Sequence, residues 1–292
     1  MREKQPVSAN KVLTRMARRF VAGETAEEAL KVVASLNERG VLASLDLLGE
    51  NVSSADDAKR CAAEYCSLIA AIASAGLQAN VSLKLTMLGL DSSEELCRDN
   101  LTAILDIARS KGNMFVRIDM EGSAYTQKTL DVFLALRREY DNLGIVLQAM
   151  LKRTQEDLRR ILDAGGRVRL CKGAYKEPPA LAFQKMYEIQ ANFLECVNLL
   201  FERCELPAIA THDQRLIDET LKLAARRDRA KDSFEFQMLY GLRRDTWYSL
   251  SAEGYRFRVY VPFGTHWLPY FTRRLRERKE NVLFVLSNLF SR

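Results

Sequence analysis

Two stretches of the chain, VSLKLT at residues 81–86 and FVRIDM at residues 115–120, show the same alternation of polar and apolar side chains. Successive side chains of a β-strand point to opposite faces of a sheet, so this alternation is typical of a strand. The polar positions are Ser82, Lys84, Arg117 and Asp119. Charge inside a buried strand is unfavourable unless a site uses it, which indicates that one face of this sheet carries chemistry.

Similar short apolar runs recur along the chain and alternate with longer amphipathic stretches. The predicted strands are Val41–Leu48, Ala79–Leu85, Met114–Met120, Gly144–Met150, Val168–Cys171, Pro207–His212, Ser233–Leu239 and Phe257–Val261. Helical patterns between them include Ala55–Ala75, Ser93–Ser110, Gln127–Tyr140, Ala182–Cys204 and Gln214–Arg227. Strands that alternate with helices predict a parallel sheet, and eight such units close a barrel. We therefore predict an α/β fold, a (β/α)8 barrel of the TIM type.

The domain organisation follows from the absence of a break in composition. No Gly/Ser-rich linker divides the 292 residues, so we predict one domain over residues 1–292. A helix over Thr25–Arg39, capped by Thr25 and ended by Gly40, gives a helical extension (1–40) ahead of the barrel (41–292). A doubly wound sheet is the competing architecture, but no predicted strand is followed by a glycine-rich phosphate-binding motif.

The composition excludes several classes of protein. The net charge is +6, but Asp and Glu are almost as numerous as Lys and Arg, which favours a solvated surface over nucleic-acid binding. None of the six cysteines forms a CxxC motif and the chain has two histidines, so we expect no metal site and a reducing, cytoplasmic environment. No apolar run approaches the ~20 residues of a spanning helix, so any membrane contact is expected to be peripheral.

Polar residues also recur in the other predicted strands, where we expect them at or near the carboxyl ends that carry barrel active sites. They are Gln148, Arg167, Arg169, Thr211, His212, Arg256, Arg258 and Tyr260. One buried Lys–Asp pair can be purely structural, but many polar residues at one end indicate a ligand. Cations outnumber acids in the set, which predicts an anionic ligand such as a carboxylate or a phosphate.

Two segments sharpen this expectation. In RLCKGAYKEP at residues 169–178, a strand leads through Gly173 into a predicted helix start, where Lys172 and backbone N–H groups can hold phosphate oxygens. The alternative is an ordinary turn between strand and helix. In THWLPYFTRRLRERKEN at residues 265–281, adjacent arginines match a carboxylate, and the alternative is a solvated basic helix face.

Taken in order, these segments resemble the proline dehydrogenase family, which includes the proline-oxidising domain of bifunctional proline utilisation proteins. The resemblance runs from Val41 to Asn281 and is most specific in RLCKGAY (169–175), ATHD (210–213), EFQMLYG (235–241) and YVPFGTH…YFTRRLRE (260–277). It implies oxidation of L-proline to Δ1-pyrroline-5-carboxylate by hydride transfer to N5 of FAD. It also implies that the electrons pass to a membrane quinone, ubiquinone or a related molecule.

The resemblance assigns roles residue by residue. The residues implied to hold the proline carboxylate, with the acid that orients the arginines, are Lys84, Arg273, Arg274 and Glu277. The residues implied to wall the ring of the substrate are Tyr175, Leu239 and Tyr260. The catalytic polar residues implied beside the flavin are Asp119 and Arg169. The remaining residues implied to contact FAD are Met120, Gln148, Cys171, Lys172, Gly173, Thr211 and His212.

The resemblance further implies a cytoplasmic enzyme that contacts the inner membrane transiently. Its expected partners are L-proline, the quinone and further copies of the same chain, but not nucleic acid. Tyr260 favours L-proline over 4-hydroxyproline, because its hydroxyl crowds a ring substituent. The tail Val282–Phe290 is a candidate for the membrane contact, although packing on the barrel is the simpler interpretation.

Two other functions are compatible with a barrel that carries these residues. A Schiff-base aldolase would use Lys84 or Lys172 as a nucleophile activated by a lowered pKa. A non-enzymatic barrel that binds anions or nucleic acid is disfavoured, because the basic residues are not interleaved with aromatic ones along one stretch.

Overall fold

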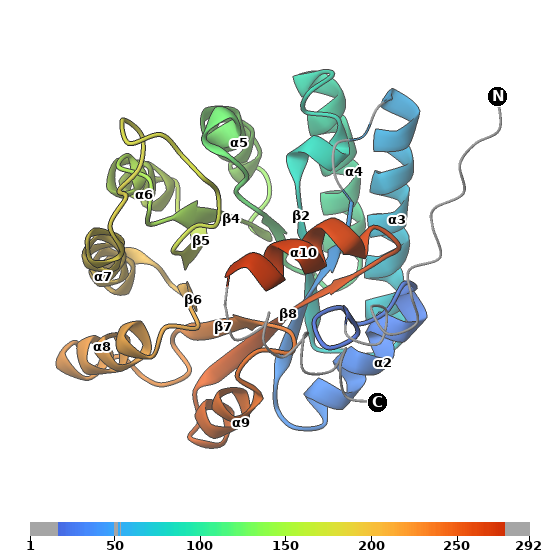
Figure 1. The fold of residues 1–292 in the computed structure, drawn as a ribbon. Helices are drawn as coiled ribbons and strands as arrows, with labels where there is room; N and C mark the ends of the chain where they lie inside the picture. The colour runs from blue at the N-terminus through green and yellow to red at the C-terminus, as the bar shows by residue number, and fades with distance from the viewer. Residues whose placement is uncertain (1–16, 50–51, 53, 278–292) are drawn as a thin grey trace.

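The fold was obtained as a computed structural model, which describes residues 17–49, 52 and 54–277, and only the backbone course of residues 273–277. Eight parallel strands form a closed barrel in sequence order, and helices surround it (Figure 1). Residues Leu42–Leu47 of the first strand pair with Arg258–Phe263 of the last, which closes the ring. The predicted (β/α)8 barrel is therefore confirmed.

The strands are β1 (Leu42–Leu47), β2 (Ala79–Leu83), β3 (Val116–Ile118), β4 (Leu143–Gln148), β5 (Arg167–Cys171), β6 (Ala208–Ala210), β7 (Glu235–Leu239) and β8 (Arg256–Phe263). The helices are α2 (Ala26–Asn37), α3 (Ala55–Ser74), the 3-10 helix η1 (Leu85–Leu88), α4 (Glu94–Ser110), α5 (Ser123–Arg137), α6 (Thr154–Asp163), α7 (Met186–Arg203), α8 (Gln214–Arg226), α9 (Arg244–Ala252) and α10 (Trp267–Glu277). None of the helices in the described part of the chain is both long enough and apolar enough to span a membrane.

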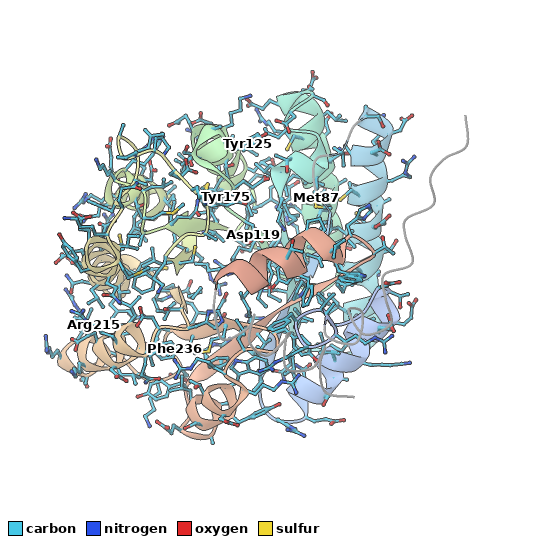
Figure 2. The ribbon with its side chains drawn as sticks, in the orientation of Figure 1. Met87, Asp119, Tyr125, Tyr175, Arg215 and Phe236 are labelled. Carbon is cyan, nitrogen blue, oxygen red and sulfur yellow. The ribbon has the colours of Figure 1, made fainter. Side chains whose placement is uncertain are left out.

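The hydrophobic core fills the shell between the strands and the helices. Outward-facing strand residues such as Val81, Ile145 and Val168 are fully buried against apolar helix faces, which include Ile104 and Phe133. Figure 2 shows the two environments, with Phe236 in this shell and Asp119 inside the ring of strands. Because the apolar half of each strand faces outward, the polar half faces the barrel interior, as the alternation predicts.

The predicted N-terminal helix is present as α2. Thr25 caps it: its hydroxyl accepts a hydrogen bond from the N–H of Glu28, whose carboxylate accepts one from the N–H of Thr25. This reciprocal capping box satisfies backbone donors that the first turn leaves unpaired. The helix packs beside β1 and β8 on the outside of the barrel (Figure 1).

The helix expected directly after Gly173 is absent, and this prediction was wrong. Residues 172–185 instead form an irregular segment that returns to the barrel at an antiparallel bridge between Leu151 and Ala182. Pro178 and Pro179 explain the difference, because proline lacks the N–H that a continuing helix requires. Helix α7 therefore begins only at Met186, later than the predicted Ala182.

Helix α10 lies over the carboxyl ends of the strands and covers one side of the barrel mouth (Figure 1). Its buried residues Trp267, Tyr270 and Phe271 pack in one cluster with Leu48, which follows β1, and with Phe20. The rings of Phe20 and Phe271 lie 6.0 Å apart. This apolar cluster anchors the first part of α10 and places its later residues near the mouth.

Candidate active site

A cavity of about 800 Å³ opens at the carboxyl ends of the strands. It is lined by residues in, or directly after, each of the eight strands. Among the sequence-predicted site residues, the structure brings together Lys84, Asp119, Met120, Gln148, Arg169, Cys171, Lys172, Gly173, Tyr175, Thr211, His212, Leu239 and Tyr260. The side chains of Arg273, Arg274 and Glu277 lie outside the described residues, but Tyr270, one turn earlier in α10, lines the cavity.

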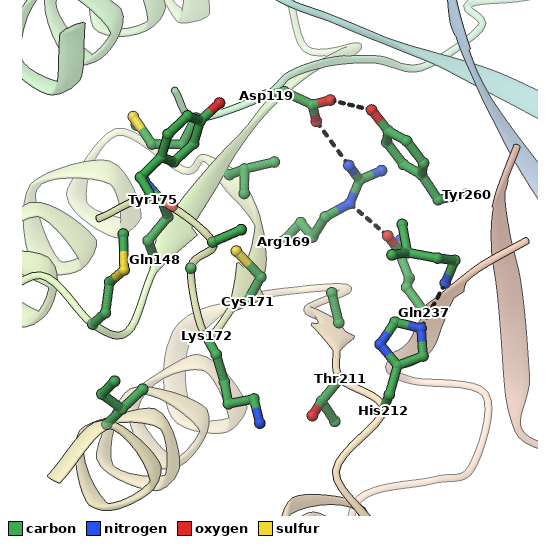
Figure 3. A pocket seen from close by; sticks show the side chains of 18 of the residues that line it. Asp119, Gln148, Arg169, Cys171, Lys172, Tyr175, Thr211, His212, Gln237 and Tyr260 are labelled. Atoms are coloured by element: carbon green, nitrogen blue, oxygen red, sulfur yellow. Dashed lines mark hydrogen bonds and ion pairs between the residues drawn. The ribbon is translucent and has the colours of Figure 1, made fainter. Parts of the chain in front are cut away.

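Arg169 stands at the centre of the cavity floor and is 5% exposed. Its Nη1 donates to Asp119 Oδ1 at 2.8 Å, and its Nη2 donates to Ser82 Oγ at 3.0 Å. Its Nε donates to the side-chain oxygen of Gln237 (Figure 3). Its Nη2 also donates to Ser44 Oγ. The guanidinium is therefore hydrogen-bonded to residues of β1, β2 and β7 and to Asp119 after β3, which fixes its plane.

Asp119 and Tyr260 are held together above this guanidinium. The Tyr260 hydroxyl donates to Asp119 Oδ2 at 2.6 Å, and the Arg169 Cζ lies 5.2 Å from the centre of the Tyr260 ring (Figure 3). Burial and the charge of Asp119 raise the pKa of Tyr260 well above its ordinary value. The phenol therefore stays protonated and acts as a hydrogen-bond donor, so that its ring has a fixed position in the cavity wall.

Lys84 forms a buried ion pair with Asp46, whose side chain is 1% exposed; Lys84 Nζ lies 2.8 Å from Asp46 Oδ1. Burial raises the pKa of Asp46. Burial opposes the charge on Lys84, but the carboxylates of Asp46 and Asp119 outweigh it and raise the pKa of the ammonium group. A Schiff-base lysine requires a lowered pKa, so this environment argues against Lys84 as the nucleophile of the aldolase alternative.

The end of β5 requires a glycine at position 173. Gly173 has a φ of +105°, and a Cβ placed there would meet Met150 Sδ at 2.5 Å. The backbone can therefore turn sharply into the cavity wall only if this residue has no side chain. Lys172 Nζ lies 3.1 Å from Asp213 Oδ2, which also accepts a hydrogen bond from Gln190 at 2.8 Å. Burial opposes ionisation of Asp213, but Gln190 and Lys172 prevail and lower its pKa.

His212 joins the ends of β6 and β7. The backbone N–H of Leu239 donates to His212 Nε2 at 2.9 Å, so this nitrogen acts as the acceptor. The carbonyl oxygen of His212 accepts a hydrogen bond from Arg243 at 2.8 Å. The histidine therefore sets the position of Leu239, which the sequence predicts to wall the cavity.

Gln148, the last residue of β4, is oriented by Glu121, which follows the adjacent strand β3. Its Nε2 donates to the carbonyl oxygen of Glu121 at 2.9 Å, and the Glu121 carboxylate accepts hydrogen bonds from the N–H and the hydroxyl of Thr86. Burial raises the pKa of Glu121. The side-chain oxygen of Gln148 thus has a defined direction in the cavity wall, where it can accept a hydrogen bond from a ligand.

Comparison with known proteins places the chain in a family. The family model for proline dehydrogenase matches residues 29–287. The chain belongs to the proline dehydrogenase family. It is 42% identical to proline dehydrogenase 1 of Bacillus subtilis over 98% of this chain and 97% of that protein. It is 36% identical to the proline dehydrogenase of Deinococcus radiodurans over 96% of this chain and 92% of that protein.

A solved structure shows the same fold. The proline utilization A protein of Bdellovibrio bacteriovorus, inactivated by N-propargylglycine, matches with a TM-score of 0.84 at 28% identity. The match covers 91% of this chain and 33% of that longer chain. The resemblance to the proline dehydrogenase family drawn from the sequence is therefore confirmed.

The sequence analysis of this proline dehydrogenase family member missed several cavity residues, and two of these pair with predicted ones. Asp46 pairs with Lys84, and Gln237 accepts a hydrogen bond from Arg169. The alternation of polar and apolar residues could have indicated both. Asp46 is the one acid in an otherwise uncharged strand, and Gln237 lies between the apolar residues Phe236 and Met238. Their partners come from other strands, and only the register of the barrel reveals them.

Four arginines were expected near the cavity, and for these the prediction was wrong: Arg117, Arg167, Arg256 and Arg258 do not line it. Alternation in a strand indicates the face of the sheet but not the height along the barrel axis. Arg117 precedes Asp119 by two residues, which places it roughly 6.6 Å further down its strand. The described lining of the cavity contains four cations, Lys84, Arg169, Lys172 and Lys176, and three acids, Asp46, Asp119 and Glu177. Lys84, Arg169 and Lys172 each pair with an acid.

Proposed function

We propose that the chain oxidises L-proline to Δ1-pyrroline-5-carboxylate, with FAD bound in the cavity at the carboxyl ends of the strands. Membership of the proline dehydrogenase family supports the reaction. The proposed location of the active site rests on the fixed guanidinium of Arg169, which is hydrogen-bonded to Asp119 and Gln237 at the floor of a large cavity. Active sites of such barrels lie at this end.

The cavity fits the chemistry of a flavin dinucleotide. Its volume of about 800 Å³ lies within the range of cofactor sites, roughly 300 to 1,000 Å³. Apolar side chains such as Val146, Met150 and Met238 suit a ring system, while Gln148 and Arg169 offer hydrogen bonds to its polar edge. Lys172, Thr211 and the backbone around Gly173 would hold the phosphates and the remaining part of the cofactor.

In this proposal the protein positions the substrate, and bound FAD supplies a hydride acceptor at its N5 atom. Lys84, kept protonated by Asp46, offers a positive charge to the proline carboxylate. The family resemblance adds Arg273 and Arg274 to this carboxylate site. Tyr175, Leu239 and Tyr260 would surround the pyrrolidine ring and exclude water from it, which favours a productive orientation.

The proposed electron acceptor is a quinone in the inner membrane, reached by transient contact of a cytoplasmic protein with the bilayer surface. The family resemblance supports this assignment. Reduction of ubiquinone-1 by proline, at a rate that rises when anionic vesicles carry the quinone, is the expected result. An enzyme that reduces oxygen but no quinone would contradict it.

The direct test of the proposed function is the visible spectrum of the purified protein before and after anaerobic addition of L-proline. We expect flavin bands near ~380 and ~450 nm that bleach with proline. Bands that persist with proline but bleach with another cyclic amine would contradict the substrate. A protein that stays colourless after incubation with excess FAD would contradict the cofactor and the reaction class together.

Replacement of Tyr260 is expected to relax the discrimination against ring-substituted substrates. The Tyr260 hydroxyl is held at Asp119, so the ring cannot move away from a substituent. Tyr260→Ser opens space there, and the ratio of kcat/KM for L-proline to that for 4-hydroxyproline should fall by about 10-fold or more, the usual effect of removing a steric contact. Tyr260→Phe removes only the hydroxyl and separates its share of the crowding from that of the ring. A ratio that stays at the wild-type value in both variants would contradict the steric explanation.

A further inference from the structure

The barrel interior carries an excess of positive charge at the N-terminal ends of the strands, opposite the cavity. We count the charged residues of the eight strands, together with Lys84 after β2 and Asp119 after β3. The cations are Lys84, Arg117, Arg167, Arg169, Arg256 and Arg258. The acids at the same positions are Asp46, Asp119 and Glu235. Each acid forms one ion pair: Asp46 with Lys84, Asp119 with Arg169, and Glu235 with Arg258. The remaining three, Arg117, Arg167 and Arg256, are called here the lower arginine cluster.

The guanidinium groups of the lower arginine cluster are incompletely hydrogen-bonded. Arg117 is 2% exposed, and its Nη1 reaches the carbonyl oxygen of Ile145 only at 3.5 Å. Within the described ranges, the buried Nε atoms of Arg117, Arg167 and Arg256 have no hydrogen-bond partner. A buried polar group without a partner costs free energy, and arginine cannot avoid that cost by losing its proton.

Two members of the cluster lie at the same aromatic ring, and the third has a buried carboxylate opposite it in the sheet. The Cζ atoms of Arg117 and Arg167 lie 4.9 and 4.3 Å from the centre of the same ring, that of Phe115. Arg256 stands opposite Glu235 in the ladder between β7 and β8.

Glu235 is already engaged by other groups. Its Oε1 accepts hydrogen bonds from Arg258 at 2.8 Å and from Gln237. Although burial opposes its ionisation, Arg258 and Gln237 lower the pKa of Glu235 to about 2. Its single negative charge is therefore present at neutral pH and is shared among several guanidinium groups. Glu205 also attracts Arg167, but it is exposed and forms no ion pair with Arg167 among the described residues.

We propose that the lower arginine cluster binds a small inorganic oxyanion of the phosphate and sulfate class, at the end of the barrel opposite the cavity. Ordered water could satisfy the free N–H groups, but it would not neutralise the uncompensated charge. An oxyanion does both, because its several oxygens accept hydrogen bonds from guanidinium donors. The ion must be small, since Arg117 is almost completely buried. It would tie β3, β5 and β8 together from inside and thus act on stability.

The test is the thermal unfolding of the full chain, with any bound cofactor retained, in rising sodium phosphate at constant ionic strength. Binding to the native state alone predicts a saturable rise in Tm, about 5 °C or more once phosphate reaches ~100-fold its dissociation constant. Sodium sulfate should act in the same way. A Tm that depends on ionic strength alone, and not on the identity of the anion, would overturn the proposal.

Two variants separate this site from phosphate binding elsewhere in the protein. Arg167→Gln changes a residue of β5 that does not line the cavity, and it should abolish the saturable rise. Arg226→Gln, on the exposed face of α8, is the control and should retain it. Arg117→Met is the stronger variant if it folds. An unchanged phosphate response in Arg167→Gln would refute the assignment, and titration calorimetry with phosphate should give one site in the unmodified chain and none in this variant.

Discussion

Arg169→Met is expected to lower kcat/KM for L-proline by about 10²- to 10³-fold, the usual effect of losing a preorganised hydrogen-bond donor at a reacting centre. The wild-type guanidinium donates to Asp119, Gln237, Ser82 and Ser44 at once. Without it, the Asp119 carboxylate keeps Tyr260 as a partner but loses its cation. Both residues then lose the position that the cavity wall requires.

The same substitution should also destabilise the protein. Removal of one partner from a buried ion pair typically costs about 3–5 kcal/mol, because it leaves a buried charge uncompensated. The Arg169–Asp119 pair meets this condition, since the two side chains are 6% and 13% exposed. Urea unfolding measures this loss, and steady-state kinetics measure the loss of activity.

Arg169→Lys separates charge from geometry. Lysine restores a cation near Asp119, but its ammonium group cannot reproduce the planar guanidinium, which donates to Asp119, Gln237, Ser82 and Ser44 at the same time. We expect most of the stability to return and most of the activity to remain lost. Arg226→Met on the surface of α8 is the control for loss of an arginine side chain. If Arg169→Met retained kcat/KM within a few-fold of wild type, the central role of this guanidinium would be untenable.

The barrel itself could be predicted from sequence because its signal is periodic. Strands such as β1 and β5 carry apolar residues on the face that packs against the helices and polar residues on the other. That pattern needs no knowledge of tertiary contacts. The short strands β3 and β6 were predicted too long, because their flanking residues share the same composition but lie beyond the hydrogen-bonded ladder.

The site could be predicted only in part, for reasons that are also physical. Alternation identified Arg169 and Arg117 equally well, yet the first lies in the cavity floor and the second does not line the cavity. The height of a side chain depends on strand register and stagger, which the sequence of one strand does not contain. For the same reason, the pairing of Lys84 with Asp46 emerges only when β1 and β2 are placed side by side.

Lys84→Met should destabilise the protein by about 3–5 kcal/mol at neutral pH, again because it removes one partner of a buried ion pair. Asp46 is 1% exposed and would remain in the barrel interior without its cation. Its pKa, already raised by burial, should rise further once Lys84 is gone. A carboxyl group whose pKa is higher in the folded than in the unfolded state contributes its full stability below the unfolded pKa, and loses it as pH rises through the folded pKa.

The destabilisation by Lys84→Met should therefore shrink as pH falls from 7.5 toward roughly 4, the ordinary pKa of an aspartate, because Asp46 then becomes neutral in both states. The double variant Lys84→Met/Asp46→Leu removes both charges and should recover most of the lost stability at every pH. Lys222→Met, which breaks an exposed ion pair with Glu219 on α8, is the matched control and should change the free energy of unfolding far less than Lys84→Met does. Urea unfolding of the four proteins across this pH range is the measurement. A loss in Lys84→Met that is independent of pH, or that the double variant does not relieve, would show that the lysine stabilises the barrel by packing and not through its charge.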